Sequence, residues 1–172
     1  MSETVLRIIE TERLILRPFK KEDAAAAYVW LSDPRVNRYM PYPLYTSVAQ
    51  AEAWIATHNA DDNEFIFCLK DNGLPIGAGS IKQQDEGAWE VGYNLRYDYW
   101  GKGYATEAAK IMIQWAYKHF NARDFVAAHV TANTASGRVL LKCGYQFDHY
   151  GQYGRYDGSE IFPATFYSMK LE

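Results

Sequence analysis

The sequence predicts an α/β (α+β) fold, in which a mixed sheet carries helices on both faces. Segments with strand-like alternation and segments with helical periodicity follow in the order strand, helices, three strands, long helix, strand, helix, two strands. The chain has 172 residues, which is enough for one domain with a real core and too short for two ordinary ones. No internal repeat, low-complexity tract or linker-like segment divides it, so we expect a single domain over residues 1–172.

The first third of the chain is predicted to hold one strand and two helices. Residues 12–17 alternate as in a half-buried strand, which a proline ends. Residues 22–31 are alanine-rich and helical, and residues 33–46 combine tyrosines with prolines, which favours a loop or a short helix. Ser47 is a suitable N-cap for a helix that runs to about His58.

The middle of the chain is predicted to hold three strands and a long helix. Residues 64–70 and 75–82 form two strands around an Asp-Asn-Gly turn, and residues 89–96 form a third. Residues 103–120 are amphipathic with a helical period. One stripe of this helix comprises Ala105, Ala109, Met112, Ala116 and Phe120.

The end of the chain is predicted to hold a strand over residues 125–132 and a short helix over residues 136–143. Gly144 is placed to end that helix, because glycine readily adopts the left-handed conformation found after helices. Two further strands are expected near residues 145–150 and 164–171.

Composition excludes several classes of protein. The net charge is −3 and no run of Lys or Arg occurs, so no nucleic-acid partner is expected, although a small anionic cofactor is compatible with this balance. The two cysteines lack CxxC spacing, no signal peptide is evident, and no apolar run approaches the roughly 20 residues of a membrane-spanning helix. We therefore expect a soluble cytoplasmic protein with no membrane partner.

A glycine-containing loop follows the third predicted strand of the middle segment and opens the long helix. Gly101 and Gly103 allow the backbone to approach a ligand closely. The free N–H groups of the first helical turn and the helix dipole then favour an anion such as a phosphate. Taken alone, the two glycines are better explained by a tight strand–helix turn. The loop matches neither the Walker pattern nor GxGxxG, which argues against a nucleotide triphosphatase or a Rossmann dehydrogenase.

Several segments, in the right order, resemble the GNAT superfamily of N-acetyltransferases, and most closely its RimJ/RimL-type branch. The acetyl-CoA motif of that superfamily is similar to residues 89–95 followed by residues 99–108. The first strand of the branch is similar to residues 11–18, and its next motif is similar to residues 133–136 and 139–145. The resemblance implies a mostly antiparallel central sheet and an enzyme that moves the acetyl group of acetyl-CoA to a primary amine by direct attack on the thioester.

The resemblance also implies which residues hold acetyl-CoA. Backbone groups of Tyr93, Asn94 and Leu95 are expected to pair with the pantetheine arm, and Asn133 to hydrogen-bond to it. The pyrophosphate is expected in the loop made by Trp100, Gly101, Lys102, Gly103, Tyr104, Ala105 and Thr106. Trp100 departs from the usual Gln or Arg of the superfamily, although Trp is usual in this branch. Lys102, Arg138 and Lys142 are candidates for neutralising phosphates, though such residues are more often solvated surface charges.

Strand alternation supplies a candidate general base. One face of residues 89–95 carries Trp89, Val91, Tyr93 and Leu95, and the other carries Glu90, Gly92 and Asn94. A central strand covered on both sides should be apolar on both, so a polar face around a glycine indicates a cleft. We expect Glu90 to take the proton of the amine, directly or through water. The alternative is a glutamate that simply faces solvent.

Ser136 is the candidate for protonating the departing thiolate, although Asn133 and Ser136 are also common helix-capping types. Many relatives place a tyrosine four residues beyond this serine, where the present chain has Leu140. That departure rules out the usual acid. It also keeps open the alternative of a non-catalytic acyl-CoA-binding or regulatory module.

Other reactive side chains are expected to be structural. His129 has no paired carboxylate nearby in sequence and is expected to pack, and the remaining histidines lack metal-ligand spacing, so no metal is expected. Cys143 lies at a helix end without an activating histidine, so a small core residue is the favoured interpretation.

Aromatic residues make up 16% of the chain, and many tyrosines lie in polar stretches where they could line a cleft. Pocket walls in the RimJ/RimL-type branch usually come from the early helices and the late strands, so the resemblance implies these candidates for the acceptor pocket: Trp30, Tyr39, Tyr42, Tyr45, Tyr150, Tyr153, Arg155 and Tyr156. Such a rim suits a protein N-terminus, a polyamine or an aminoglycoside-like molecule, and the sequence does not choose among them. Members of the superfamily often pair through their late strands, so a homodimer is an expected assembly.

Overall fold

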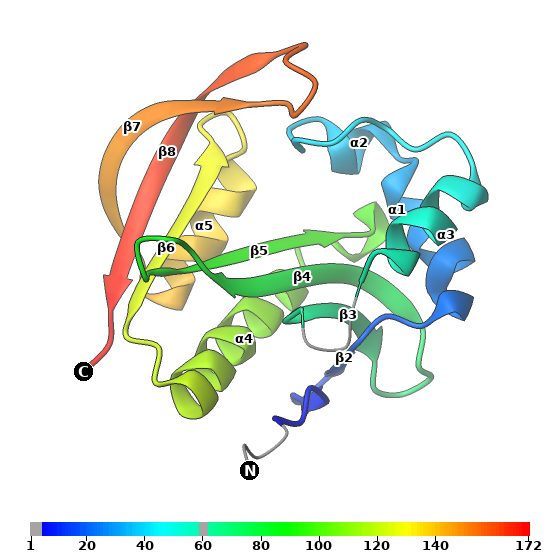
Figure 1. Ribbon diagram of the computed structural model, residues 1–172, viewed down its shortest axis with the longest axis horizontal. Helices are drawn as coiled ribbons and strands as arrows, with labels where there is room; N and C mark the ends of the chain where they lie inside the picture. The colour runs from blue at the N-terminus through cyan, green and yellow to red at the C-terminus, as the bar shows by residue number, and fades with distance from the viewer. Residues whose placement is uncertain (1–4, 59–61) are drawn as a thin grey trace.

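The computed structural model describes residues 5–58 and 62–172, which form one eight-stranded sheet with strand order β1-β2-β3-β4-β5-β6-β8-β7 (Figure 1). Every neighbouring pair is antiparallel except β5 and β6, which are parallel. The strands are β1 (Ile9–Glu10), β2 (Leu14–Arg17), β3 (Glu64–Leu69), β4 (Pro75–Gln83), β5 (Trp89–Leu95), β6 (Asp124–Val130), β7 (Gln146–Gly154) and β8 (Ile161–Lys170). The mixed, mostly antiparallel sheet is confirmed.

Helices cover both faces of this sheet, as predicted. They are η1 (Lys21–Asp23), α1 (Ala24–Leu31), α2 (Pro34–Asn37), α3 (Val48–Ala56), η2 (Tyr97–Tyr99), α4 (Tyr104–Phe120) and α5 (Thr134–Cys143). Strand β3 shows how the faces divide: Phe65 and Phe67 join the core under α4, while Ile66 and Cys68 join the core under α1 and α3. None of the helices in the described ranges is long and apolar enough to span a membrane.

The feature that creates space for a ligand is the divergence of β5 from β6. These strands pair only at Trp89 with Phe125 and at Glu90 with Val126, and they separate beyond that point (Figure 1). Strand β6 continues along β8 as far as Val130 and Ala164, whereas β5 continues along β4 as far as Leu95 and Gly77. The sheet is therefore split between β5 and β6 on the C-terminal side of Glu90.

Two predicted boundaries were wrong in ways that matter for the site. The helix expected over residues 136–143 begins at Thr134, with Asn133 as its N-cap residue, so Ser136 lies within the first turn instead of starting the helix. The final hairpin is longer than expected, because β7 and β8 pair as far as Gly154 and Ile161. The other predicted elements are present, including the N-cap of α3, where the side chain of Ser47 accepts from the N–H of Gln50.

Candidate functional site

A cleft of about 910 Å³ opens where β5 and β6 diverge. Its walls come from α2 and the loop after it, from the end of β5 with the loop into α4, and from the start of α5. The lining residues are Pro34, Arg35, Val36, Arg38, Tyr39, Met40, Tyr93, Asn94, Leu95, Tyr99, Trp100, Gly101, Gly103, Tyr104, Ala105, Thr106, Ala132, Asn133, Thr134, Ala135, Ser136, Arg138, Val139 and Lys142.

The N-terminus of α4 faces this cleft and has the geometry of an anion site. Gly101 and Gly103 adopt φ angles of +71° and +84°, values that residues other than glycine rarely adopt. Gly103 is the N-cap residue of α4 and makes no side-chain cap, so N–H groups of the first turn remain available. Because this 17-residue helix also presents the positive end of its dipole here, a phosphate is the type of group that the loop favours.

Residues far away in sequence hold this loop in place. The guanidinium of Arg13, just before β2, donates to a carboxylate oxygen of Glu107 at 2.8 Å and to the carbonyl of Lys102 at 3.0 Å. The hydroxyl of Thr11 donates to the other carboxylate oxygen of Glu107. These bonds hold the pKa of Glu107 below its ordinary value even though burial acts in the opposite direction.

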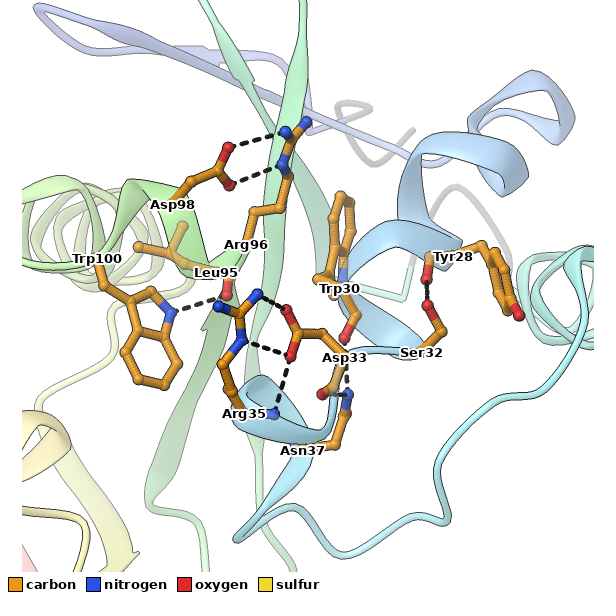
Figure 2. Close-up of polar contacts among 10 residues, drawn as sticks. All are labelled: Tyr28, Trp30, Ser32, Asp33, Arg35, Asn37, Leu95, Arg96, Asp98 and Trp100. Atoms are coloured by element: carbon orange, nitrogen blue, oxygen red, sulfur yellow. Dashed lines mark hydrogen bonds and ion pairs between the residues drawn. The ribbon is translucent and has the colours of Figure 1, made fainter.

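On the opposite wall, α2 is fixed by its own polar contacts, grouped around the end of β5 in Figure 2. Asp33 accepts from the backbone N–H of Arg35 and pairs with its guanidinium at 2.7 Å. That guanidinium also lies 3.8 Å from the ring centroid of Tyr97 in η2. The indole N–H of Trp100 donates to the carbonyl of Leu95 at 2.9 Å (Figure 2). Trp100 lines the cleft and is 41% exposed.

The charge of the cleft is one-sided. Four cations line it, and among the described lining residues none is an aspartate or glutamate. Arg35 pairs with Asp33, and Arg38 with Glu160 at 3.7 Å. Arg138 and Lys142, on α5, form no ion pair with any residue in the described parts of the chain. In a protein of net charge −3, this local excess of positive charge favours an anion in the cleft.

Two asparagines that line the cleft have side-chain atoms without a hydrogen-bond partner among the described residues. The side-chain amide of Asn94 donates to the hydroxyl of Tyr42 at 2.6 Å, while its Oδ1 is buried without a hydrogen-bond partner. Asn133 lines the cleft, and its side chain makes no hydrogen bond to the residues that the structure describes. The side chain of Asn133 fits a ligand that supplies a missing partner, whereas Oδ1 of Asn94 is closed off from the cleft. The side chain of Asn133, the unpaired cations and the helix N-terminus together fit a phosphate-bearing molecule with a polar arm.

The structure brings together most residues that the sequence singled out. Of the fifteen residues expected to act in catalysis or to hold acetyl-CoA, thirteen line the cleft, as does Tyr39 from the expected acceptor wall; the thirteen are Tyr93, Asn94, Leu95, Trp100, Gly101, Gly103, Tyr104, Ala105, Thr106, Asn133, Ser136, Arg138 and Lys142. Lys102 does not line the cleft, since its side chain is exposed and its ammonium lies 5.5 Å from the ring centroid of Tyr99. Glu90 does not line the cleft either.

Glu90 lies at the closed end of the split, at the last residue pair that joins β5 to β6. It occupies the polar face of β5 with Asn94, as the alternation predicted. Its side chain is exposed to solvent, yet the protein packed around the carboxyl raises its pKa above the ordinary value. The carboxyl also contributes to raising the pKa of the Tyr153 hydroxyl, which is raised mainly by burial.

On the other face of β5, the hydroxyl of Tyr93 lies 3.1 Å from both the carbonyl oxygen and Oγ of Ser136. Leu140 occupies the next turn of α5 and is 1% exposed, so its side chain belongs to the core. Burial raises the pKa of the Tyr93 hydroxyl, an effect that the contact with Ser136 partly offsets.

Some residues proved to be structural. Trp30 was expected in the pocket wall, but it is fully buried in the core under α1 and α3. His129 packs as predicted: its ring contacts the carbonyl of Val130 at 2.7 Å and the hydroxyl of Tyr167 at 3.2 Å. Cys143 packs against the core, and burial raises the pKa of its thiol to about 11.

Sequence reasoning missed the contribution of α2 to the cleft. Arg35 and Arg38 follow the Asp-Pro pair at residues 33–34, which is a helix-start signal, but nothing in their spacing indicates that this short helix faces the split between β5 and β6. The role of Glu107 was also missed, because it depends on contacts with Thr11 and Arg13.

Comparison with known proteins identifies the family. Residues 13–146 match the family model described as an acetyltransferase (GNAT) domain. The chain is 32% identical over 148 residues to the uncharacterized N-acetyltransferase p20 of Bacillus licheniformis, covering 82% of this chain and 83% of that protein. It is 30% identical over 166 residues to the uncharacterized N-acetyltransferase YnaD of Bacillus subtilis strain 168, covering 95% and 97%.

Solved structures agree with this. A GNAT-family acetyltransferase from Bacillus anthracis superposes with a TM-score of 0.85 at 26% identity, over 95% of this chain and 98% of that one. Two more distant structures share the fold. A putative ribosomal-protein-serine acetyltransferase from Vibrio cholerae superposes with a TM-score of 0.83 at 17% identity, over 98% of this chain and 100% of that one. The microcin C7 self-immunity acetyltransferase MccE, in complex with acetyl-CoA and AMP, superposes with a TM-score of 0.78 at 19% identity, over 94% of each chain. The chain belongs to the GNAT superfamily, whose general reaction is acetyl-CoA-dependent N-acetylation, and it is an N-acetyltransferase.

Proposed function

We propose that this single-domain enzyme, of the RimJ/RimL-type branch, transfers the acetyl group of acetyl-CoA directly to a primary amine, with the cleft between β5 and β6 as its active site. The observation that carries the proposal is the anion-binding N-terminus of α4. It opens into a cleft that holds four cations and, among the described lining residues, no carboxylate.

The free edge of β5 supports the placement of the pantetheine arm. From Val91 to Leu95, β5 pairs with β4 on one side, whereas no described strand pairs with it on the side of β6. Backbone N–H and C=O groups of Tyr93, Asn94 and Leu95 on that edge are therefore available to the amides of the arm, as if it were an added strand. The loop from Trp100 to Thr106 then holds the pyrophosphate, with Arg138 and Lys142 beside it.

The second half of the reaction concerns protons. The thioester supplies an activated acetyl group, and the acceptor must attack it as a neutral amine. Glu90, at the closed end of the split on the polar face of β5, removes the proton of the amine directly or through a bridging water. A raised pKa suits this role, since it brings the base closer to working pH. Ser136 faces the departing sulfur from the first turn of α5.

The acceptor is a primary amine carried by a peptide N-terminus or by a small molecule. Tyr39 and Met40 line the cleft, and Tyr42 contacts Asn94 beside it, so the acceptor end has an aromatic wall. Two of the distant structures are named for different roles, one as a putative ribosomal-protein-serine acetyltransferase and one as a microcin C7 self-immunity acetyltransferase. The rival function is a non-catalytic acyl-CoA-binding module, which the burial of Leu140 in the usual position of the tyrosine acid favours.

An acceptor panel tests the proposal. Purified protein is incubated with acetyl-CoA and, in separate reactions, with peptides that start with Ser or Ala, polyamines and aminoglycosides, while release of CoA thiol is followed. Thiol release that depends on one class of amine supports the transferase and identifies its acceptor. Binding of acetyl-CoA without release in any reaction supports the binding module instead.

A further inference from the structure

The contact between Tyr93 and Ser136 joins two hydroxyl groups that both belong to the cleft. Tyr93 comes from β5 and Ser136 from α5, and both residues line the cavity. The phenol oxygen lies 3.1 Å from Oγ of Ser136 and 3.1 Å from its carbonyl oxygen. Strand β5 and helix α5 are thus connected on the side of the cleft where the leaving sulfur is expected.

A serine hydroxyl alone is poorly directed, because it carries one proton on a freely rotating bond and two acceptor lone pairs. The carbonyl of Ser136 lies inside α5, where the helix already provides a donor from the residue four positions on. The phenol of Tyr93 therefore donates its hydrogen bond more favourably to Oγ of Ser136. When Oγ accepts this bond, the hydroxyl proton of Ser136 itself is free to point into the cleft.

We infer that Tyr93 positions Ser136 for the leaving group: the phenol donates to Oγ of Ser136, and the hydroxyl of Ser136 donates to the sulfur as the carbon–sulfur bond breaks. The inference rests on the proposed function and assigns Tyr93 a role through its side chain, beyond the backbone contacts expected of it. In the step itself, the amine nitrogen bonds to the acetyl carbon, the sulfur departs with the bonding electron pair, and the amine gives up one proton to Glu90. The thiolate later takes one proton from solvent.

This arrangement does not need the tyrosine acid that Leu140 replaces. A thiol of ordinary pKa near 8.5 leaves as an anion when a hydrogen bond and a helix N-terminus stabilise it, and Ser136 lies in the first turn of α5. Burial keeps the Tyr93 phenol protonated over the working pH range, because its pKa is raised. It therefore remains a donor throughout.

A double-mutant cycle separates positioning from mere packing. Ser136→Ala should lower kcat about 30-fold, and Tyr93→Phe about 10-fold, with the Kd for CoA changed less than about 2-fold in both. The variant that combines them should be no slower than Ser136→Ala, because Tyr93 acts through that serine. Tyr117→Phe is the matched control. Tyr117 lies near the C-terminal end of α4, and its phenol donates to the carbonyl of Glu172. The kcat of this variant should equal that of the unsubstituted chain.

The contrary result is equally distinct. If the phenol only docks α5 through the carbonyl of Ser136, then Tyr93→Phe costs the same factor with Ser136 present or absent, and the losses multiply. That outcome, or a loss that appears in the Kd for CoA instead of in kcat, overturns the inference while leaving the transferase intact. Absence of turnover by the unsubstituted chain with every amine overturns the proposed function, and this inference with it.

A second readout needs no turnover. The pKa of the thiol of bound CoA is measured from the ultraviolet absorbance of the thiolate. It should lie below that of free CoA in the unsubstituted protein, and it should rise by about half a unit in Tyr93→Phe and about one unit in Ser136→Ala. A thiol pKa that is the same in all three proteins contradicts the inference.

Discussion

Arg13 and Glu107 are 94 residues apart in sequence and form a bond of 2.8 Å between Nε and Oε1 that ties the sheet to the first turn of α4. The backbone N–H of Arg13 donates to the other carboxylate oxygen at 3.0 Å, and the hydroxyl of Thr11 donates to the same atom. The guanidinium also donates to the carbonyl of Lys102, in the loop from Trp100 to Thr106 that opens α4. The loop conformation therefore depends on a residue outside the loop, which leads to the first prediction.

Glu107→Gln should weaken both stability and cofactor binding. The loss of charge weakens two bonds to Arg13, so we expect the free energy of unfolding to fall by about 1 kcal/mol. This loss of stability is small because the Arg13 side chain is 39% exposed and solvent screens the pair. The KM for acetyl-CoA should rise, since the loop loses its anchor. Thermal unfolding and steady-state kinetics measure the two effects, with the exposed Glu52→Gln on α3 as a control that should change neither.

The same pair predicts a pH dependence. The pKa of Glu107 is lowered in the folded protein, so its contribution to stability is complete above the ordinary glutamate pKa of about 4.3 and is lost as pH falls through the lowered value. The difference in Tm between the unsubstituted chain and Glu107→Gln should be constant near neutral pH and shrink under acid conditions. A difference that grows as pH falls would show that the carboxylate does not stabilise this fold.

Gly103→Ala should weaken acetyl-CoA binding, whereas a glycine-to-alanine change with a similar loss of stability outside the cleft should not. A side chain at φ +84° is strained, and a Cβ there would lie 3.3 Å from the guanidinium of Arg13. Gly87 provides a matched control, since it has φ +96° with open space around it, in the turn between β4 and β5. Both alanine variants should lose about 1 kcal/mol of stability, but Gly103→Ala alone should raise the Kd for acetyl-CoA, by about 10-fold. Equal Kd values in both variants would place the pyrophosphate elsewhere.

Lys142→Ala and Arg138→Ala should each raise the KM for acetyl-CoA about 3- to 10-fold, because each removes an unpaired cation from the cleft wall. The effect should shrink as salt rises, since exposed charges are screened. Lys118→Ala, on an exposed part of α4 outside the cleft, is the control and should leave KM unchanged. A KM that responds neither to the two substitutions nor to salt would contradict a phosphate site on α5.

Glu90→Gln should remove one limb of the pH profile. A base must be deprotonated to act, so kcat/KM should fall as pH drops through the pKa of Glu90, which is raised above its ordinary value. The amide variant should lose this limb and about 100-fold in rate, a typical loss for a general base. Glu86→Gln, in the exposed turn before β5, should behave like the unsubstituted chain with the same amine. A full rate across the pH range in Glu90→Gln would exclude the role of this carboxylate.

Local signals were enough to predict most of the fold. The alternation in β3 and β4 around an Asp-Asn-Gly turn, the amphipathic period of α4 and the glycine after α5 each specify a structure within a few residues. The boundary of α5 was wrong because Asn133 and Ser136 are both common capping types and the sequence does not show which of them takes the N-cap position. Asn133 takes it, without a side-chain cap.

The candidate site was only partly predictable for a physical reason. The motif residues cluster in sequence, and the loop from Trp100 to Thr106 is therefore visible as a unit. The split between β5 and β6 arises from the parallel pairing of strands that α4 separates in sequence, and no local pattern encodes where that pairing stops. The same reason hides the wall made by Arg35 and Arg38 and the contact between Tyr93 and Ser136.

The most direct test of the central claim follows an isotopic label in a single turnover. Protein in excess over acetyl-CoA labelled in the acetyl group is mixed with the accepted amine, quenched at intervals and separated into protein, amine and CoA. Direct transfer predicts that the label appears on the amine at the same rate as CoA thiol is released, with none on the protein. The half-buried thiol of Cys143, with its pKa raised to about 11, should stay unlabelled. Label that accumulates on the protein before it reaches the amine, or thiol release that does not depend on the amine, would contradict direct transfer in this cleft.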